Sequence, residues 1–233
     1  MKKSFLIFLF LINFLIIFSQ KKSDTSFLFK KTWVYKSYQK IFIDNNRNSD
    51  FIKELKNATK TEFYQFSEMF NATIDSISKN EVQFSTKRIA TKWYPLYLYK
   101  GKYYLYSASD PGTSTWIGIT DKAIYQLYFE PGIVPAVIEE VHEVNPNQIN
   151  IKLFNELEQH YSLNIHWINE AKGLAVFEKI NKSNQKIYYL MVSEENMKDY
   201  SIVVNYCKEQ RVDEFEFEKI DYKKLLNSSI KIK

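Results

Sequence analysis

The sequence contains little cysteine, glycine, proline and arginine, and these shortages exclude several classes of protein. The one cysteine, Cys207, excludes an intramolecular disulfide and any metal site built from paired cysteines. With 5 Gly and 5 Pro, the chain has no linker rich in these residues. We therefore predict a single domain over residues 20–233.

An excess of charge of one sign is also missing. The formal net charge is +5, and removal of Lys2 and Lys3 with a signal peptide would leave 5 − 2 = +3. Arginine occurs only at Arg47, Arg88 and Arg211. Because the remaining positive charge is small and dispersed, we predict no nucleic-acid partner.

The longest apolar stretch lies near the N-terminus. Lys2 and Lys3 precede an apolar run from Phe5 to Phe18, which is the pattern of a secretory signal peptide over residues 1–19. The run is shorter than the roughly 20 residues that span a bilayer. We predict an exported protein, periplasmic or secreted, with no stable membrane span after cleavage.

Aromatic residues are plentiful, at 17% of the chain, and the clearest local pattern is an aromatic hairpin around Lys100 and Gly101. Glycine adopts positive φ without a Cβ clash, so this dipeptide favours a two-residue turn. The turn predicts three cross-strand pairs: Leu98 with Tyr103, Tyr97 with Tyr104, and Leu96 with Leu105.

Neither face of this hairpin is polar. One face carries leucines and is expected to meet the core, and the other carries only tyrosines. Tyrosine suits packing under another element, lining of a ligand cavity, or an exposed recognition surface, because its ring is apolar and its hydroxyl needs a partner. The ligand-binding hypothesis uses this face and a nearby tryptophan, with these residues: Tyr97, Tyr99, Tyr104, Tyr106 and Trp116.

The rest of the chain alternates apolar and polar residues over short segments. These segments predict strands over 33–43, 62–70, 73–77, 81–84, 116–119, 122–129, 136–144, 148–154, 163–168, 173–180, 186–192 and 213–220. Asp50 is expected to begin a short helix, and Ser193 to begin a helix over 193–211. About ten short strands with one or two short helices predict a mainly β fold, an antiparallel β-barrel or β-sandwich. An α+β fold is the alternative.

Candidate catalytic residues are few. Glu140 and His142 fall on one face of an expected strand, and His166 follows later in the chain. A carboxylate beside a histidine can serve acid–base chemistry or bind a metal. The spacing matches no zinc signature, and no nucleophile elbow or phosphate loop is present. We therefore assign no catalytic residue, metal or cofactor.

These patterns favour an exported, non-catalytic binding protein whose partner is an apolar or amphipathic small molecule. An envelope structural or interaction component, with an envelope protein as partner and no ligand cavity, is the alternative. A hydrolase or metal enzyme that uses Glu140, His142 or His166 ranks below both.

Overall fold

The computed structural model describes residues 25–32, 38–77, 89–110, 116–127, 133–207 and 212–229. The predicted signal peptide over 1–19 and the strand expected over 81–84 lie outside these ranges. Strands make up 54% of the structure and helices 22%. The predicted mainly β fold is confirmed, and the barrel is the form that the protein adopts.

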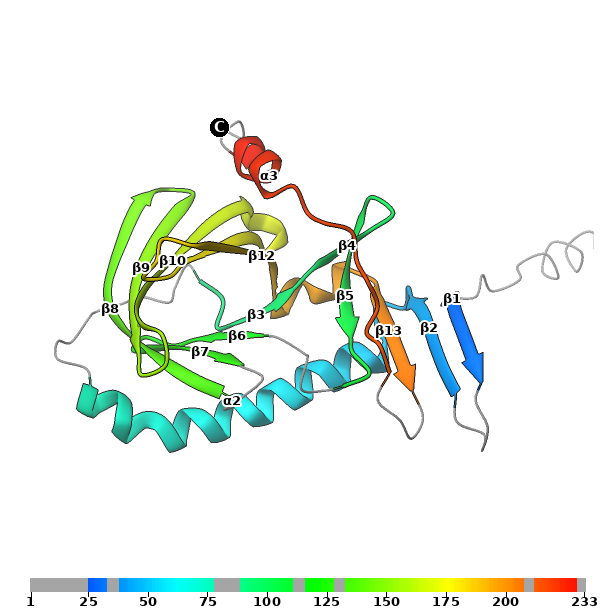
Figure 1. Cartoon of the computed structure of the whole chain (residues 1–233), viewed down its shortest axis with the longest axis horizontal. Coiled ribbons are helices and arrows are strands. Elements are labelled where there is room, and N and C mark those ends of the chain that lie inside the picture. Colours follow the sequence, from blue (N-terminus) through cyan, green and yellow to red (C-terminus); the bar gives the residue numbers. More distant parts are fainter. Residues whose placement is uncertain are drawn as a thin grey trace, which may run out of the picture.

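Eight antiparallel strands close into a barrel (Figure 1). Each barrel strand pairs with the next one along the chain, and the last pairs with the first. The strands are β3 (Lys92–Pro95), β6 (Ile117–Ile119), β7 (Ala123–Leu127), β8 (Ile133–Asn145), β9 (Gln148–Asn155), β10 (Gln159–Asn169), β11 (Leu174–Ile180) and β12 (Lys186–Ser193). A short 3-10 helix, η4 (Glu170–Lys172), joins β10 to β11.

A five-stranded sheet stands beside the barrel (Figure 1). Its strands, in spatial order, are β1 (Thr25–Thr32), β2 (Tyr38–Asp44), β13 (Ile202–Cys207), β5 (Lys102–Ser107) and β4 (Tyr97–Tyr99). The hairpin of β4 and β5 is inserted in the chain between barrel strands β3 and β6. Leu96 joins β3 to β4, and its N–H donates to the carbonyl of Leu190 at 2.7 Å. One extended ribbon therefore connects the barrel to the second sheet.

The predicted hairpin is confirmed in turn and register. Lys100 and Gly101 have φ angles of 47° and 71°, which are the positive values that a two-residue turn of this kind requires. Tyr97 pairs with Tyr104, and Leu98 with Tyr103.

Three hydrophobic clusters hold the elements together. The first draws side chains from every barrel strand and therefore fills the barrel interior, with Trp93, Trp167 and Phe177 among its largest members. The second lies between the outer barrel wall, the second sheet and a long helix, and includes Leu96 and Leu105 from the leucine face of the hairpin. The third lies on the opposite face of the second sheet, under residues 212–221, which we call the C-terminal segment.

Helix α2 (Asp50–Ile77) corrects two expectations. It is 28 residues long, so the short helix expected at Asp50 continues through the strands expected over 62–70 and 73–77, and both strand predictions are wrong. Ile52, Phe63 and Ile74 share one helical stripe, and that stripe packs on the second cluster. No helix among the described residues combines the length and the apolar character needed to cross a membrane.

The helix expected over 193–211 is also wrong. Only η5 (Glu194–Asp199), a 3-10 helix, forms at its start, and β13 follows. Residues 208–211 lie outside the described part of the chain. The β-branched run Ile202-Val203-Val204 is buried between β2 and β5 and pairs with both. Branching at Cβ disfavours helix and suits a central strand, so tertiary pairing decides this segment.

The first strands and the last segment of the described chain differ from the predicted strands in their bounds. Strand β1 begins at Thr25, in a segment that the sequence does not mark as a strand, and β2 begins at Tyr38, inside the strand expected over 33–43. The segment expected as a strand over 213–220 is extended, with a single bridge from Glu218 to Leu98. Helix α3 (Tyr222–Ser229) follows it.

Gly118 offers a test of how α2 packs on the barrel. A Cβ at this position would lie 2.4 Å from Cε2 of Phe63 on α2. We expect Gly118→Ala to lower the free energy of unfolding by roughly 1–3 kcal/mol, because the added methyl overpacks the contact. In a Phe63→Ala background the cost should fall by at least about 0.5 kcal/mol, since the nearer of the two clashing rings is gone and only Cζ3 of Trp116, at 2.9 Å, remains. Equal costs in both backgrounds, measured by chemical denaturation, would contradict this packing.

Candidate functional site

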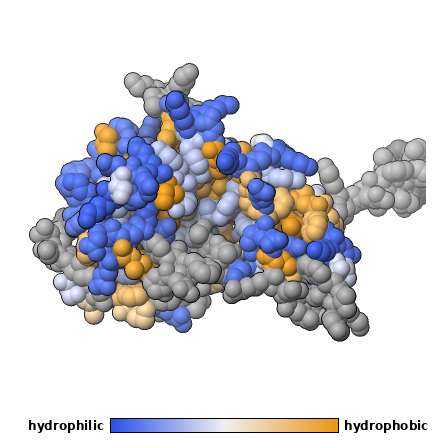
Figure 2. All heavy atoms as spheres, viewed as in Figure 1, coloured by the Kyte–Doolittle hydropathy of each residue, from blue (hydrophilic) through white to orange (hydrophobic). Residues whose placement is uncertain are grey.

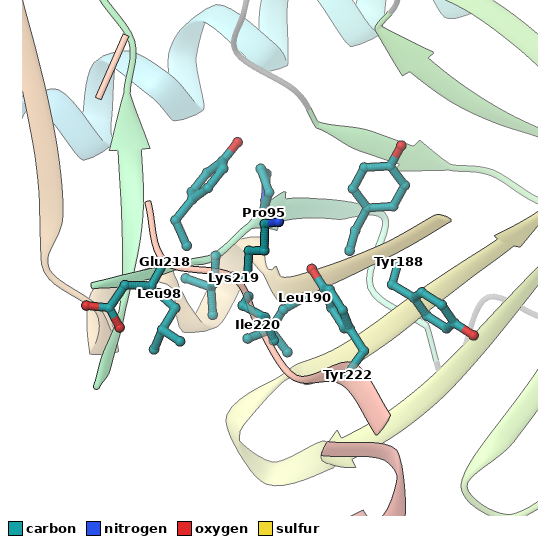
Figure 3. Close-up of a pocket in the computed structure, with 11 residues that line it drawn as sticks. Pro95, Leu98, Tyr188, Leu190, Glu218, Lys219, Ile220 and Tyr222 are labelled. Carbon is teal, nitrogen blue, oxygen red and sulfur yellow. The ribbon is translucent and has the colours of Figure 1, made fainter. Parts of the chain in front are cut away.

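A groove of about 530 Å³ lies between the barrel wall, the β4 strand and the C-terminal segment (Figure 3). Its volume falls within the range of small-molecule sites, roughly 300–1,000 Å³. We call it the C-terminal groove. Its lining consists of Pro95, Leu96, Tyr97, Leu98, Tyr188, Tyr189, Leu190, Glu218, Lys219, Ile220 and Tyr222.

The groove is built from three chain segments that are distant in sequence. The β3–β4 ribbon supplies the leucines at 96 and 98, β12 supplies Tyr188 and Leu190, and the C-terminal segment with α3 supplies the remaining wall. Tyr188 and Tyr222 stack on each other, with ring centroids 5.3 Å apart and planes inclined by 22°. This stack lies in the lining of the groove and links α3 to the barrel.

Backbone and side-chain hydrogen bonds hold the C-terminal segment against the hairpin. The N–H of Glu218 donates to the carbonyl of Leu98 at 2.9 Å, and Oε1 of Glu218 accepts from the N–H of Lys100 at 2.7 Å. Glu214 accepts from the Ser109 hydroxyl at 2.7 Å and from the hydroxyl of Tyr106. The segment is therefore fastened at two points, one on each side of Phe215 and Phe217.

The tyrosine face of the hairpin lies under this segment. Tyr97 stacks on Phe217 at 4.7 Å, and Tyr99 meets Phe215 edge-to-face at 5.2 Å. Tyr106 contacts Phe217 at 5.0 Å, and burial, with its hydrogen bond to Glu214, raises the pKa of its hydroxyl. Of the three fates that the sequence leaves open, these contacts match packing under another element.

The residues predicted to bind a ligand do not form one site. Tyr97, Tyr99, Tyr104 and Tyr106 lie together, but only Tyr97 also lines the C-terminal groove. Trp116 is 1% exposed in the second cluster, where it meets Phe63 of α2 edge-to-face at 5.9 Å.

A polar network sits on the outer barrel wall next to the groove and centres on Glu178, whose side chain is 8% exposed. Its carboxylate accepts hydrogen bonds from Asn164 at 2.7 Å and from the hydroxyl of Tyr188 at 2.9 Å. Lys186 forms an ion pair with it at 2.8 Å, and Nε2 of His166 lies 3.3 Å away. Tyr188 therefore belongs to both the groove and the network.

These donors fix the charge of Glu178. Burial alone raises the pKa of its carboxyl, but the hydrogen bonds from Lys186, Asn164, Tyr188 and His166 outweigh burial and lower the pKa to about 2. General acid–base catalysis works best with a pKa near the working pH. A carboxylate held this firmly in its ionised form positions its neighbours and is poorly suited to proton transfer.

The other candidate catalytic residues lie apart from this network. Nε2 of His142 and Oε1 of Glu140 are 2.5 Å apart on β8, with half-exposed side chains, and Glu140 also pairs with Lys152 on β9. The hydrogen bonds from Lys152 and His142 lower the pKa of Glu140. Within the described ranges, no three histidine, cysteine or acidic residues gather as a metal site. The geometry does not join His166 to Glu140 and His142 in one catalytic centre.

Sequence reasoning missed most of the groove. Tyr188 and Tyr189 form an aromatic doublet on a strand that was predicted, and this doublet is the one local signal that could have marked them. Ile220 and Tyr222 carry no such signal, because their position depends on where the C-terminal segment crosses the barrel.

Replacement of Glu178 tests whether the network is structural. We expect Glu178→Gln to lower the free energy of unfolding at pH 7 by roughly 1–3 kcal/mol, because buried donors lose their charged acceptor. The pKa of Glu178 lies below its ordinary value of 4.5 in the folded protein. Its stabilising effect is therefore complete above pH 4.5 and is lost as the pH falls toward 2.

The control is Glu140→Gln, which removes an exposed glutamate that also has a lysine and a histidine as partners. It should change stability much less than Glu178→Gln does, because water screens the charge of an exposed glutamate. Thermal unfolding of both variants between pH 2 and pH 7 makes the comparison. If the stability gap between native protein and Glu178→Gln stayed constant over this range, Glu178 would not be the titrating group.

Comparison of the chain with models of protein families, with curated proteins and with solved structures found no match.

Proposed function

We propose that the protein is an exported, non-catalytic binding protein that holds an amphipathic small molecule in the C-terminal groove. The observation that carries the proposal is the lining of the groove. Apolar side chains such as Leu96, Leu98 and Leu190 lie beside tyrosines and two charged residues, Glu218 and Lys219. Ligand sites commonly combine an apolar surface with a few polar groups that fix orientation.

The electrostatics of the tyrosines support binding over chemistry. Burial raises the pKa of Tyr188, Tyr189 and Tyr222, so their hydroxyls remain protonated at neutral pH. Protonated hydroxyls do not act as nucleophiles or bases. The hydroxyl of Tyr188 already donates to Glu178, and Tyr189 packs against the cluster inside the barrel, so Tyr222 is the tyrosine that can donate to a ligand. Export is supported by the charged and apolar pattern of residues 2–18.

Ile220 provides the test of ligand binding in the groove. We expect the native protein to bind the neutral fluorophore N-phenyl-1-naphthylamine, and Ile220→Lys to weaken binding by at least about tenfold. An ammonium would replace a side chain that contributes apolar surface to the site. Fluorescence titration measures the affinity, and thermal unfolding establishes that the variant is folded.

The matched control is Ile187→Lys, on the same barrel strand as Tyr188 but 46% exposed and outside the groove lining. This control should bind the fluorophore as the native protein does. A folded Ile220→Lys variant with unchanged affinity would rule out the groove as the binding site.

A second candidate function, an interaction component of the envelope, is favoured by one observation. Strand β1 forms an edge of the second sheet and exposes Phe27 and Phe29 at 64% and 44%. On the face seen in Figure 2, hydrophobic atoms gather over the second sheet, whereas hydrophilic atoms predominate over the barrel. Exposed aromatic edge strands are sites where another chain can add a strand.

Photocrosslinking tests this second function. A benzoylphenylalanine in place of Phe29 should give one discrete crosslinked species in cells, because a partner strand would cover the edge. The same amino acid in place of Leu157, which is 52% exposed on the barrel, is the control. Identical crosslinking patterns at both positions would count against a partner at β1.

A further inference from the structure

We infer that the ligand of the C-terminal groove is a single-chain amphiphile with an anionic head group. This inference rests on the proposed function, and it adds the charge of the ligand. It starts from the two charged residues of the lining, Glu218 and Lys219, which have different surroundings.

The acidic side chains at the groove accept hydrogen bonds from backbone N–H groups of the protein. Oε1 of Glu218 accepts from the N–H of Lys100 at 2.7 Å and so fastens the C-terminal segment to the hairpin turn. Asp221, the next acidic residue along the chain, accepts from the N–H of Lys224 at 2.9 Å at the start of α3. Both carboxylates therefore have backbone donors that offset part of their charge.

Two of the lysines near the groove have a partner within the protein, and the third does not have an ion pair with any described residue. Lys186 is paired with Glu178 at 2.8 Å, and Nζ of Lys100 lies 5.2 Å from the ring centre of Tyr99. Lys219 lines the groove and, among the residues that the structure describes, has no ion pair. Its four-carbon stem can lie along apolar surface while its ammonium meets a charged head group. Because the carboxylate of Glu218 is hydrogen-bonded to the hairpin turn, the ammonium of Lys219 is the charged group of the lining that is left to meet a ligand.

Tyr222 supplies a second donor for the same anion. Its hydroxyl oxygen is hydrogen-bonded to the backbone of Leu190, and Figure 3 shows the ring of Tyr222 directed back toward that residue. A hydroxyl that accepts from a backbone N–H keeps its own proton for donation. Tyr188 is different, because its hydroxyl already donates to Glu178 at 2.9 Å. Tyr222 and Lys219 together can bind one carboxylate or phosphate oxygen pair.

The remaining lining suits an alkyl chain. Pro95, Leu96, Leu98, Leu190 and Ile220 form a continuous apolar set that contains no charged group. An unbranched chain gains roughly equal stabilisation from each buried methylene. The groove therefore offers a cationic end and an apolar floor, which is the complement of an anionic amphiphile.

The test compares ligands that share a chain and differ in head group. Dodecanoate, dodecyl phosphate, 1-dodecanol and dodecyltrimethylammonium would be titrated against the native protein at pH 8, in competition with N-phenyl-1-naphthylamine and below their micelle concentrations. We expect one or both anions to bind more tightly than the alcohol, and the cation to bind most weakly. The titrations with dodecanoate and dodecyl phosphate distinguish a carboxylate ligand from a phosphate ligand.

Variants of Lys219 test whether this residue causes the preference for anionic amphiphiles. Lys219→Gln should weaken binding of the preferred anion by about threefold to fivefold, as expected for an exposed ion pair. It should leave the affinity for 1-dodecanol unchanged. Lys219→Arg should keep the preference for the anion. Lys223→Gln, which removes an exposed lysine of α3 outside the lining, is the matched control and should change neither affinity.

The outcomes separate this inference from the proposed function. Binding of all four amphiphiles with equal affinity, or preference for the cation, would overturn the anionic ligand and leave the groove as a binding site. An anion preference that is undiminished in Lys219→Gln would also overturn it, because the head group would then not bind at Lys219. Failure of every amphiphile and of the fluorophore to bind would overturn the proposed function itself.

Discussion

The contact between the C-terminal segment and the hairpin is the interaction on which the candidate site depends. Phe217 stacks on Tyr97 at 4.7 Å, and the bonds of Glu214 and Glu218 fasten the segment on either side. Without this contact the tyrosine face would be exposed, and the groove would lack the wall that Ile220 and Tyr222 provide. The tyrosine face of the hairpin thus packs against the chain's own C-terminal segment, and the C-terminal groove lies beside it.

The ribbon through Leu96 gives this contact a fixed position relative to the barrel. Because β3 and β4 are nearly continuous, the hairpin cannot shift without disturbing the barrel strand that pairs with β12. On the barrel side, Glu178 holds Tyr188 in place through a hydrogen bond of 2.9 Å. The groove is therefore placed between two firmly held walls, which favours binding because little conformational entropy is lost when a ligand enters.

Local features of the sequence predicted the parts of the fold that local chemistry decides. The Lys100-Gly101 turn sets the register of its hairpin, and the strands expected over 136–144 and 148–154 form as parts of β8 and β9. The strand prediction over 62–70 is wrong because two patterns overlap there. Tyr64, Phe66 and Phe70 alternate as in a strand, whereas Phe63, Phe66 and Phe70 have helical spacing, and the packing of Phe63 and Phe70 on the second cluster selects the helix. The groove could not be predicted, since its walls come from three separate segments of the chain, residues 95–98, 188–190 and 218–222.

The central claim is that a ligand occupies the C-terminal groove. The most direct measurement is a crystal structure of the mature protein purified from its own cells without detergent. The account predicts elongated density against Leu98, Leu190 and Ile220, with its polar end at Lys219 and Tyr222. Density for a bound molecule inside the barrel or on the β1 edge, with the groove side chains closed on one another, would contradict it.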